Sequence, residues 1–342
     1  EELCRVLADF VRIMEGYRVD DYRATASSAI SEASNSLYVL GKIHQLTGLS
    51  VTVLSNSEQR FLSYKALAAM EDNFNKIIEK GTAILDLDGG SIQISLFDKD
   101  ALVTTQNIRM GSLRIRERLA GIQSETEHYE EMVEELIWNE VSSFKKMYLK
   151  DRKIENIMLI GDVFTDSVYQ NIEEKTTKII SRENFNTWYE KIIRQSPMEL
   201  AVKLGIPLEN ASLMYPSAVI YKCLIDMMGA EHIWIPGVHM TRGIAYEYAE
   251  QMKLLKGGHN FENDILMAAK NIGKRYAVNR PHVQNLEMTA LAMFDATKKM
   301  HGMKERERLL LQMAVMLHDV GKYISFNNVA DSSYNIIMSN EI

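Results

Sequence analysis

Residues 81–108 constrain the fold most, because they hold three apolar, β-type runs in direct succession. The runs are TAILDL at 82–87, SIQISLF at 91–97 and ALVTTQNI at 101–108, all rich in residues that favour strands. Asp88-Gly-Gly and Asp98-Lys-Asp separate them, and short breaks of this composition are typical of turns. We therefore predict three consecutive antiparallel strands here.

The rest of the chain divides into blocks of different character. In residues 1–80 helical spacing alternates with short strands, as in an α/β layer. Helical stretches and buried strands continue to about residue 256, and from 257 onwards only helical patterns remain. We predict an α/β lobe at 1–80, a second α/β lobe at 81–256 and the start of an all-α domain at 257–342.

Composition narrows the class of protein. The chain is 46% hydrophobic and 25% charged, as in soluble globular proteins, and holds no apolar run of bilayer-spanning length. We expect a cytoplasmic protein with no membrane partner. The net charge of -7 argues against a nucleic-acid partner, which usually meets a basic face. A phosphate ligand stays compatible with this charge, because backbone N–H groups and a few cations suffice to bind it.

The stretch Ile84-Leu-Asp86-Leu-Asp88-Gly89-Gly90-Ser91 indicates where a phosphate could bind. A buried strand ends near an aspartate and enters a two-glycine turn, whose N–H groups can point into one concavity. Asp86 could hold a divalent cation, as carboxylates do in phosphoryl-transfer sites. On its own, the same segment also fits an ordinary hairpin with a Gly-Gly turn.

The surrounding sequence resembles the exopolyphosphatase / guanosine pentaphosphate phosphohydrolase family. That family carries D-x-G-G-G-S-x-E and then M-G-x-x-x, and this chain has Asp86, Gly89, Gly90 and Ser91 in register, followed by Met110-Gly111-Ser-Leu. The resemblance extends, in order, over nearly all of residues 1–256. Its other parts are Thr25 to Asn35 for T-x-x-L-R-x-A-x-N, Ser55-Asn-Ser-Glu58-Gln-Arg60-Phe61 for G-x-E-E-A-R-L, and Tyr215-Pro216 to Gly243 for the closing segment.

The resemblance implies an actin-like fold, in which two ribonuclease H-like lobes bind phosphates in the cleft between them. It places the catalytic glutamate at Glu58, a water-orienting role at Gln93, and Mg²⁺ at Asp86. Phosphate-binding residues would be Gly89, Gly90, Ser91 and Gly111. The substrate would be polyphosphate or a guanosine polyphosphate, and the protein a homodimer. Glu58 also follows Ser55 by three residues, so a helix capping box is an equally physical role for it.

Several positions depart from the family pattern. Gln93 stands where the family has a second glutamate, and an amide cannot act as a general base. Ser31 replaces a phosphate-binding arginine, which removes a bidentate cation. Asp88 replaces the first glycine of the triplet and brings a negative charge toward the phosphates. The family's first phosphate loop, D-x-G-S-N, has no counterpart, so we expect a chain trimmed at both ends.

The string Leu317-His318-Asp319-Val320-Gly321-Lys322 follows an apolar helix, and His282 precedes it on another helical stretch. This arrangement resembles an HD-type domain, which binds divalent metals through histidines and aspartates. Imidazole and carboxylate ligands suit a divalent transition metal such as Mn, Fe or Zn. A vestigial helical domain that only packs on the body is the alternative.

Two functions of different class remain open from the sequence. One is a phosphohydrolase that releases terminal phosphate from polyphosphate or guanosine pentaphosphate. The other is a degenerate, non-catalytic sensor that binds a phosphorylated ligand and signals through the helical domain. The first function is favoured by the family residues that the chain retains, namely Glu58, Asp86 and Gly-Gly-Ser. The second is favoured by the replacement of a family glutamate by Gln93 and of a family arginine by Ser31.

Overall fold

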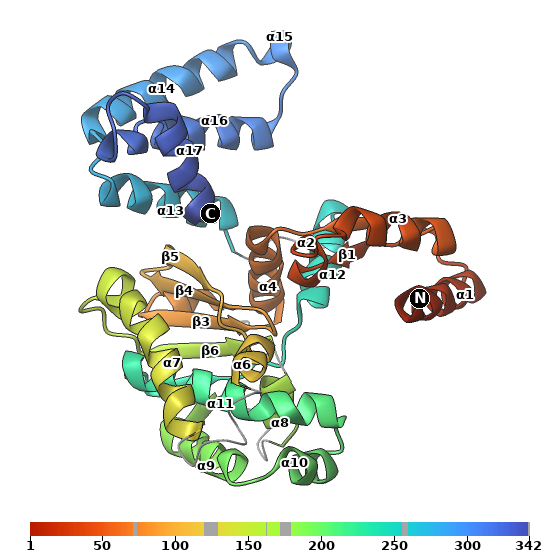
Figure 1. The fold of residues 1–342 in the computed structure, drawn as a ribbon. Coiled ribbons are helices and arrows are strands. Elements are labelled where there is room, and N and C mark those ends of the chain that lie inside the picture. Colours follow the sequence, from red (N-terminus) through yellow and green to blue (C-terminus); the bar gives the residue numbers. More distant parts are fainter. Residues whose placement is uncertain (71–73, 120–128, 162, 172–178, 255–258, 341–342) are drawn as a thin grey trace. The chain divides into compact units, whose positions relative to one another are not determined.

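The computed structural model describes residues 1–70, 74–119, 129–161, 163–171, 179–254 and 259–340. The chain forms two compact units, one of Glu1–Met70 with Val238–Lys256 and one of Glu71–Gly237 with Gly257–Ile342 (Figure 1). Residues 238–256, which the sequence placed in the second lobe, thus pack with the first unit. The expected linker at Gly257-Gly258 lies outside the described residues.

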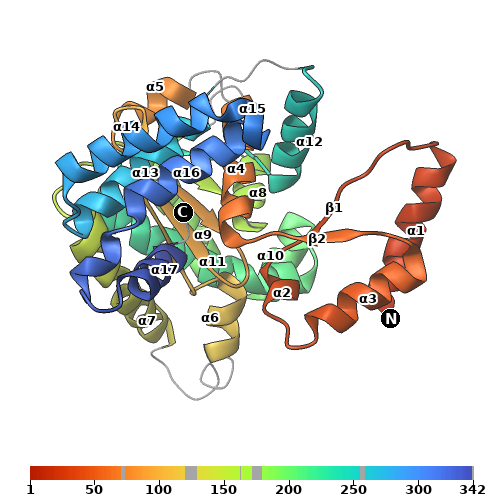
Figure 2. The ribbon, with the colours of Figure 1, turned by 90° about the horizontal axis from the view of Figure 1, so that it is seen from above.

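The first unit has a two-stranded parallel sheet of β1 (Ala24–Ala26) and β2 (Val51–Val53), visible in Figure 2. Its helices are α1 (Glu2–Gly16), α2 (Ser28–Ser31), α3 (Ser36–Thr47), α4 (Asn56–Met70) and α12 (Met240–Gln251).

Helix α12 joins the first unit by close packing on α4. A Cβ atom on Gly243 of α12 would lie 1.9 Å from the Leu62 carbonyl oxygen of α4, so only glycine permits this approach. Lys65 of α4 is buried and pairs with Glu247 (3.2 Å) and Glu250 (3.1 Å) of α12. These contacts explain why residues 238–256 belong here.

The second unit is built on a six-stranded mixed sheet in the order β5-β4-β3-β6-β8-β7. β3 pairs antiparallel with β4, and β4 with β5, which confirms the three antiparallel strands expected at 81–108. β3, β6 and β8 are parallel, and β7 pairs antiparallel with β8. The strands are β3 (Thr82–Leu87), β4 (Ile92–Asp98), β5 (Ala101–Ile108), β6 (Asn156–Ile160), β7 (Ile179–Ser181) and β8 (His232–Trp234).

Alternation along the strands places the main core on one face of this sheet. Leu85, Leu87, Ile92 and Ile94 are completely buried and belong to one cluster with side chains of the covering helices. Those helices and short segments are α6 (Ser112–Leu119), α7 (Tyr129–Phe144), the π-helix η1 (Lys145–Leu149), α8 (Val163–Asn171), α9 (Arg182–Ile193), α10 (Pro197–Leu204) and α11 (Leu208–Met228). In α5 (Phe74–Ile78), Phe74 packs edge-on against Phe97 of β4.

The C-terminal part of the second unit is helical, as expected from the sequence. Its own apolar cluster includes Ala269, Ile272, Val283, Met316 and Leu317. The elements are α13 (Phe261–Arg275), α14 (Arg280–Ala296), α15 (Lys298–His301), α16 (Glu305–Leu317), the 3-10 turn η2 (Val320–Tyr323) and α17 (Val329–Asn340). No helix in the described ranges is both long and apolar enough to cross a membrane.

Candidate functional site

A row of polar side chains crosses the sheet on the face opposite the main core. Asp86 of β3 is the register partner of Gln93 of β4, and Gln93 is the partner of Asn107 of β5. Because directly opposed residues share a face, the three side chains are neighbours. Gln93, in the middle of the row, is only 6% exposed, whereas Asp86 and Asn107 are half-buried. The structure therefore brings the predicted Asp86 and Gln93 together.

The turn between β3 and β4 is closed by its own aspartate. The N–H groups of Gly90 and Ser91 both donate to Asp88 Oδ1, at 2.7 Å each, and Asp88 N–H donates to the Ser91 carbonyl at 3.0 Å. These two N–H groups are the ones that the sequence assigned to a phosphate. In this structure they hold the Asp88 carboxylate, an anion supplied by the chain itself.

Gly111 lies directly against this turn. A Cβ atom on Gly111 would lie 2.3 Å from the Gly89 carbonyl carbon and 2.4 Å from Gly90 N. The start of α6 is fixed there, because Ser112 N–H donates to the Asp88 carbonyl and Arg114 N–H to the Gly89 carbonyl, both at 3.1 Å. The predicted phosphate-binding residues thus converge on one place. Gly111 serves there as a close-contact position, which is the reason that a glycine stands in the M-G motif.

Two residues near this turn were missed by sequence reasoning. Arg114 Nε donates to the Gly90 carbonyl at 3.0 Å, which places a guanidinium beside the turn. Gly161, after β6, has φ +113°, and a Cβ atom there would lie 2.6 Å from Asp86 Oδ1. The basic run that follows Gly111 could have indicated Arg114. The contact of Gly161 could not be inferred, because it depends on the pairing of β3 with β6.

Glu58 stands in the first turn of α4, in the first unit, and forms the capping box. Its Oε2 accepts from Ser55 N–H and from Ser55 Oγ, both at 2.9 Å, and its own N–H donates to Ser55 Oγ at 3.2 Å. Glu58 therefore does have the helix-capping role that its spacing from Ser55 allowed. Ser31, at the position of the family arginine, is exposed at the end of α2.

The predicted metal ligands of the helical region do converge. Ligand atoms of His282 on α14, His318 at the end of α16, and Asp319 lie within 4.8 Å of one another, and the two rings have centroids 5.8 Å apart. His318 Nδ1 lies 2.7 Å from the Val315 carbonyl, which makes Nδ1 the donor and leaves Nε2 as the ligand atom. Nε2 then lies 3.2 Å from Asp319 Oδ1, so both atoms could bind one cation.

Two other residues of the HDVGK string support this cluster. Lys322 Nζ donates to Asp319 Oδ2 at 2.6 Å and supplies one positive charge. A Cβ atom on Gly321 would lie 2.2 Å from the Val329 carbonyl, so a glycine is needed where α17 approaches. Ser333 of α17 then bridges Gly321 N–H and the His318 carbonyl, at 2.9 Å each.

The motif order and the fold together define a class of protein, and comparison with known families agrees. The model of the Ppx/GppA phosphatase family matches residues 1–252, and that of Ppx/GppA phosphatase, domain III, matches residues 266–342. The chain belongs to the Ppx/GppA phosphatase family. An HD-type assignment for the helical region is not part of that match, since this region corresponds to the third domain of the family.

Individual relatives are distant. The chain is 20% identical to a bifunctional 3-dehydroquinate synthase/phosphatase of Fusobacterium nucleatum, over 68% of this chain and 36% of that protein. It is 18% identical to a guanosine-5'-triphosphate,3'-diphosphate pyrophosphatase of Vibrio atlanticus, over 94% of this chain and 62% of that protein. The chain therefore spans less than two thirds of the length of these curated relatives.

Solved structures share the fold. An exopolyphosphatase from Cytophaga hutchinsonii has a TM-score of 0.63 at 16% identity, covering 72% of this chain and 80% of that one. The Aquifex aeolicus member of the Ppx/GppA family has a TM-score of 0.57 at 17% identity, covering 75% and 82%. These likenesses establish an α/β fold of the Ppx/GppA actin-like type with a helical C-terminal region.

Proposed function

We propose that the protein is a phosphoanhydride hydrolase that releases terminal phosphate from polyphosphate or from a guanosine polyphosphate. The single observation that carries this proposal is the convergence of Gly89, Gly90 and Gly111 beside the Asp86–Gln93 pair. These residues span 26 positions of sequence, from Asp86 to Gly111, yet they meet at one end of two paired strands. A simple hairpin turn needs only its own two glycines, whereas here a third, Gly111 just before α6, is pressed against the turn.

Each group has a distinct role in the proposed reaction. Asp86 would hold Mg²⁺, which neutralises charge on the transferred phosphoryl group. Gln93 would orient the attacking water, since an amide can position a water that it cannot deprotonate. Glu58, whose carboxylate also caps α4, would serve as the base. Arg114 adds positive charge beside the turn.

The contact of Asp88 with the turn sets a condition on this function. A phosphate oxygen can use the N–H groups of Gly90 and Ser91 only after the Asp88 carboxylate has moved away, and a cation held by Asp86 would attract that carboxylate. We therefore expect weak binding of free phosphate and a requirement for Mg²⁺. Asp88, at the position of the first glycine of the family triplet, is therefore compatible with hydrolysis.

The test is phosphate release by the full-length protein from long-chain polyphosphate and from guanosine pentaphosphate, with and without Mg²⁺. Asp86→Asn should lower the rate at least about 100-fold, because it removes the carboxylate that positions the cation. Asp98→Asn, at the other turn of the same sheet, is the matched control and should retain activity. If the protein binds these substrates with no release above background, the chain is a non-catalytic phosphate-ligand binder.

A second candidate function, divalent-metal binding, rests on the His282–His318–Asp319 cluster. The ligand distances and the orientation of His318 by the Val315 carbonyl support a transition-metal site. Elemental analysis of purified protein should find close to one Mn, Fe or Zn per chain, lost in His318→Ala and retained in His232→Ala. Metal content near zero in the natural protein, after growth with added metal, would make this cluster purely structural.

A further inference from the structure

The edge strand β5 is held to the helical region by specific hydrogen bonds. An edge strand leaves backbone groups without strand partners, and here side chains of α13 take that place. Leu102 N–H donates to Asp264 Oδ1 at 3.3 Å, and Asn271 Nδ2 donates to the carbonyls of Leu102 (3.3 Å) and Val103 (3.0 Å). Asp264 is itself buried and bonded to His259 Nε2 at 2.7 Å. Strand and helix are thus fixed at one end.

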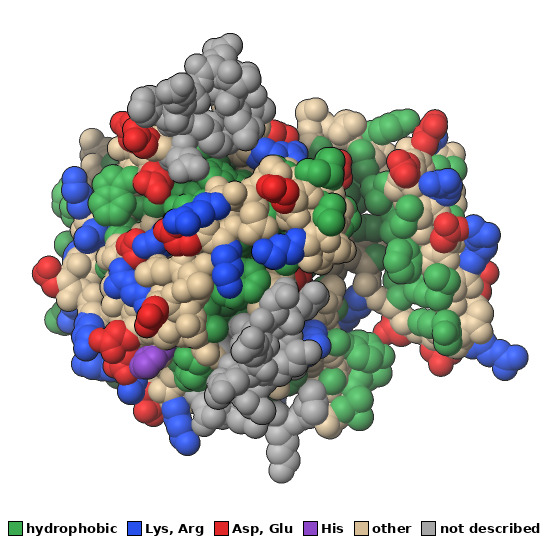
Figure 3. Space-filling model, turned by 90° about the horizontal axis from the view of Figure 1, so that it is seen from below, with side chains coloured by type: hydrophobic (Ala, Val, Ile, Leu, Met, Phe, Trp, Pro, Cys, Tyr) green, Lys and Arg blue, Asp and Glu red, His purple; other side chains and the backbone are tan. Residues whose placement is uncertain are grey.

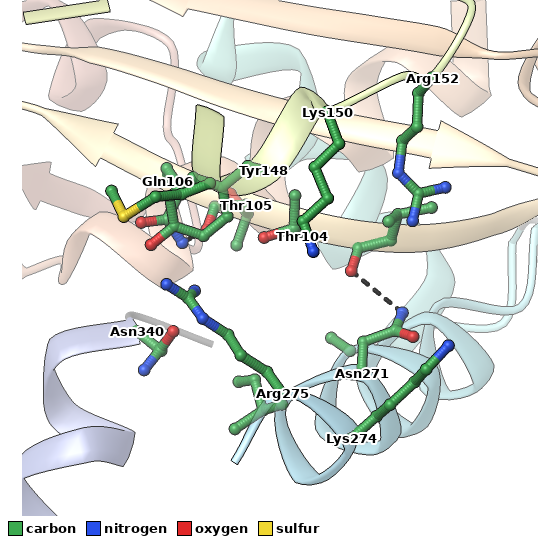
Figure 4. A pocket seen from close by; sticks show the side chains of 14 residues that line it. Thr104, Thr105, Gln106, Tyr148, Lys150, Arg152, Asn271, Lys274, Arg275 and Asn340 are labelled. Atoms are coloured by element: carbon green, nitrogen blue, oxygen red, sulfur yellow. Dashed lines mark hydrogen bonds between the residues drawn. The ribbon is translucent and has the colours of Figure 1, made fainter. Parts of the chain in front are cut away.

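Beyond this end a cavity of about 370 Å³ opens within the second unit, a size typical of small-ligand sites. Its walls are β5, the segment that includes η1 and its following loop, α13, and Asn340 at the end of α17. In Figure 4 Lys150 and Arg152 extend from one wall, while Lys274 and Arg275 extend from α13 on the opposite wall. The pocket therefore gathers cations from two segments more than 100 residues apart in sequence.

The charge of this pocket is unusual for this molecule. Its lining holds four basic residues and no acidic one, in a chain whose net charge is -7. Among the described residues, Lys150, Lys274 and Arg275 form no ion pair, and Arg152 has only Asp98 at 4.0 Å. On the face drawn in Figure 3, by contrast, basic and acidic side chains lie interspersed. Excess positive potential in a concave site favours an anionic ligand.

One of these cations, Arg275, is held against an aromatic ring, and another, the exposed Lys150, follows an unusual backbone segment. The Arg275 guanidinium carbon lies 4.4 Å from the centre of the Tyr148 ring, and that ring stacks on Phe144 at 5.5 Å. Lys150 follows the π-helix η1 and has φ +52°, a conformation that side chains rarely adopt. π-helical turns and positive-φ residues cluster at functional sites, because the local strain must be offset elsewhere.

We propose that this pocket binds a compact anion with two or three linked phosphate groups, at a place separate from the Asp88–Ser91 turn. Four cations match the charge of a triphosphate chain, and the guanidinium of Arg275 suits phosphate oxygens. Thr104, Gln106 and Asn340 add neutral polar groups to the walls. Bound there, the ligand joins β5 and η1 to α13, so it strengthens the attachment of the helical region to the sheet.

The test is calorimetric titration of the full-length protein carrying Asp86→Asn, which suppresses turnover, with inorganic tripolyphosphate. Lys150→Gln/Arg275→Gln should weaken binding at least about 100-fold, about tenfold for each charge-assisted contact. The control pair Lys146→Gln/Arg280→Gln removes the same charge from neighbouring exposed positions and should change affinity less than about threefold. A thermal unfolding scan without ligand checks that both pairs are folded at the titration temperature, because Arg275→Gln also removes the contact with Tyr148.

Further titrations test whether the phosphate chain belongs to a nucleotide or to inorganic polyphosphate. If guanosine triphosphate binds as tightly as tripolyphosphate and guanosine does not bind, the pocket accepts a phosphate chain that is part of a nucleotide. If only tripolyphosphate binds, the pocket is specific for the inorganic chain. Tripolyphosphate should also slow amide hydrogen exchange in 261–275. Equal weakening by the pocket pair and the control pair would overturn the proposal, as would the absence of binding at millimolar ligand. Because the enzymatic test uses phosphate release and this one uses binding, either proposal can fail alone.

Discussion

The turn marked by the family motif and the pocket marked by no motif differ in how their polar groups are satisfied. At the turn, the N–H groups of Gly90 and Ser91 hold the Asp88 carboxylate. Glu58, the other residue that the motif marks for chemistry, accepts two hydrogen bonds from Ser55. In the pocket, Lys150 and Arg275 have no carboxylate partner among the described residues.

This difference teaches that a motif identifies positions, whereas the surrounding charges decide what those positions can bind. A donor already bonded to a carboxylate must lose that bond before it accepts a ligand, so the net gain is small. A cation in a pocket without carboxylates gives its full interaction to the ligand, apart from the loss of hydration. The pocket is therefore ready for an anion, and the turn requires a rearrangement or a metal ion.

The largest expected effect concerns the dual role of Glu58. A glutamine satisfies a capping box nearly as well as a glutamate, so Glu58→Gln should leave the melting temperature nearly unchanged. If the carboxylate is the catalytic base, phosphate release should fall by about 10²–10⁴-fold. Rates with polyphosphate and thermal unfolding are measured on the same preparations.

A second capping box supplies the control for that experiment. Glu199 Oε2 accepts from Ser196 N–H at 2.8 Å and from Ser196 Oγ at 2.9 Å, the same geometry as in α4. Glu199→Gln should leave both activity and stability near their natural values. Full activity in Glu58→Gln would show that this residue only caps α4, and the motif-marked region would lose its proposed base.

The next effect, on stability, tests whether packing positions the turn. Gly111→Ala puts a methyl group 2.3–2.4 Å from backbone atoms of Gly89 and Gly90, which cannot move without breaking the turn. We expect a loss of about 2–4 kcal/mol in the free energy of unfolding, measured by urea denaturation. Gly273→Ala on α13 meets its nearest atoms at 3.8 Å and should be neutral or stabilising by up to about 1 kcal/mol. Equal effects of the two variants would contradict the close packing at Gly111.

The sequence predicted the elements of the second unit better than their contacts. The strands predicted at 82–87, 91–97 and 101–108 followed from composition and turn residues, and the structure confirms them at 82–87, 92–98 and 101–108. The edge strand β7 (Ile179–Ser181) was missed, because a three-residue run carries no periodicity. The membership of residues 238–256 in the first unit could not be predicted either, since it depends on the contact of Gly243 with Leu62.

The candidate sites show the same limit. The motif placed Gly111 near Gly89 correctly, and the resemblance of His282 and the HDVGK string to an HD-type domain predicted a real convergence of side chains. The sequence indicated that Asp88 adds a negative charge, but the direction of its side chain became evident only from the two hydrogen bonds to Gly90 and Ser91. The pocket was not predicted, because Lys150 and Arg275 meet only through the docking of α13 on β5.

A smaller effect is expected from opening the turn. Asp88→Gly removes the carboxylate that occupies the two N–H groups and restores the family triplet. Phosphate and pyrophosphate should bind about tenfold more tightly at the turn, the equivalent of about 1.4 kcal/mol from one released hydrogen-bonded anion. Equilibrium dialysis with labelled phosphate, in the Lys150→Gln/Arg275→Gln background, restricts the measurement to the turn. Unchanged affinity would mean that the carboxylate does not compete with the ligand.

The last comparison distinguishes the two regions by their response to salt, and the smallest effect is expected at the turn. The pocket attracts its ligand through exposed side-chain charges, which ions screen over about 10 Å at 0.1 M salt and about 3 Å at 1 M. Tripolyphosphate binding by the Asp86→Asn protein should therefore weaken by about tenfold between about 0.05 M and 0.5 M NaCl.

The opened turn of Asp88→Gly, with the pocket cations removed, binds mainly through backbone N–H groups at short range. Its affinity for pyrophosphate should change by only about twofold over the same interval, because fewer full charges take part. The two titrations are made in the same buffers, with NaCl as the single variable. Parallel salt responses would mean that both regions bind through general electrostatic attraction, and the contrast between a satisfied turn and an unneutralised pocket would then not hold.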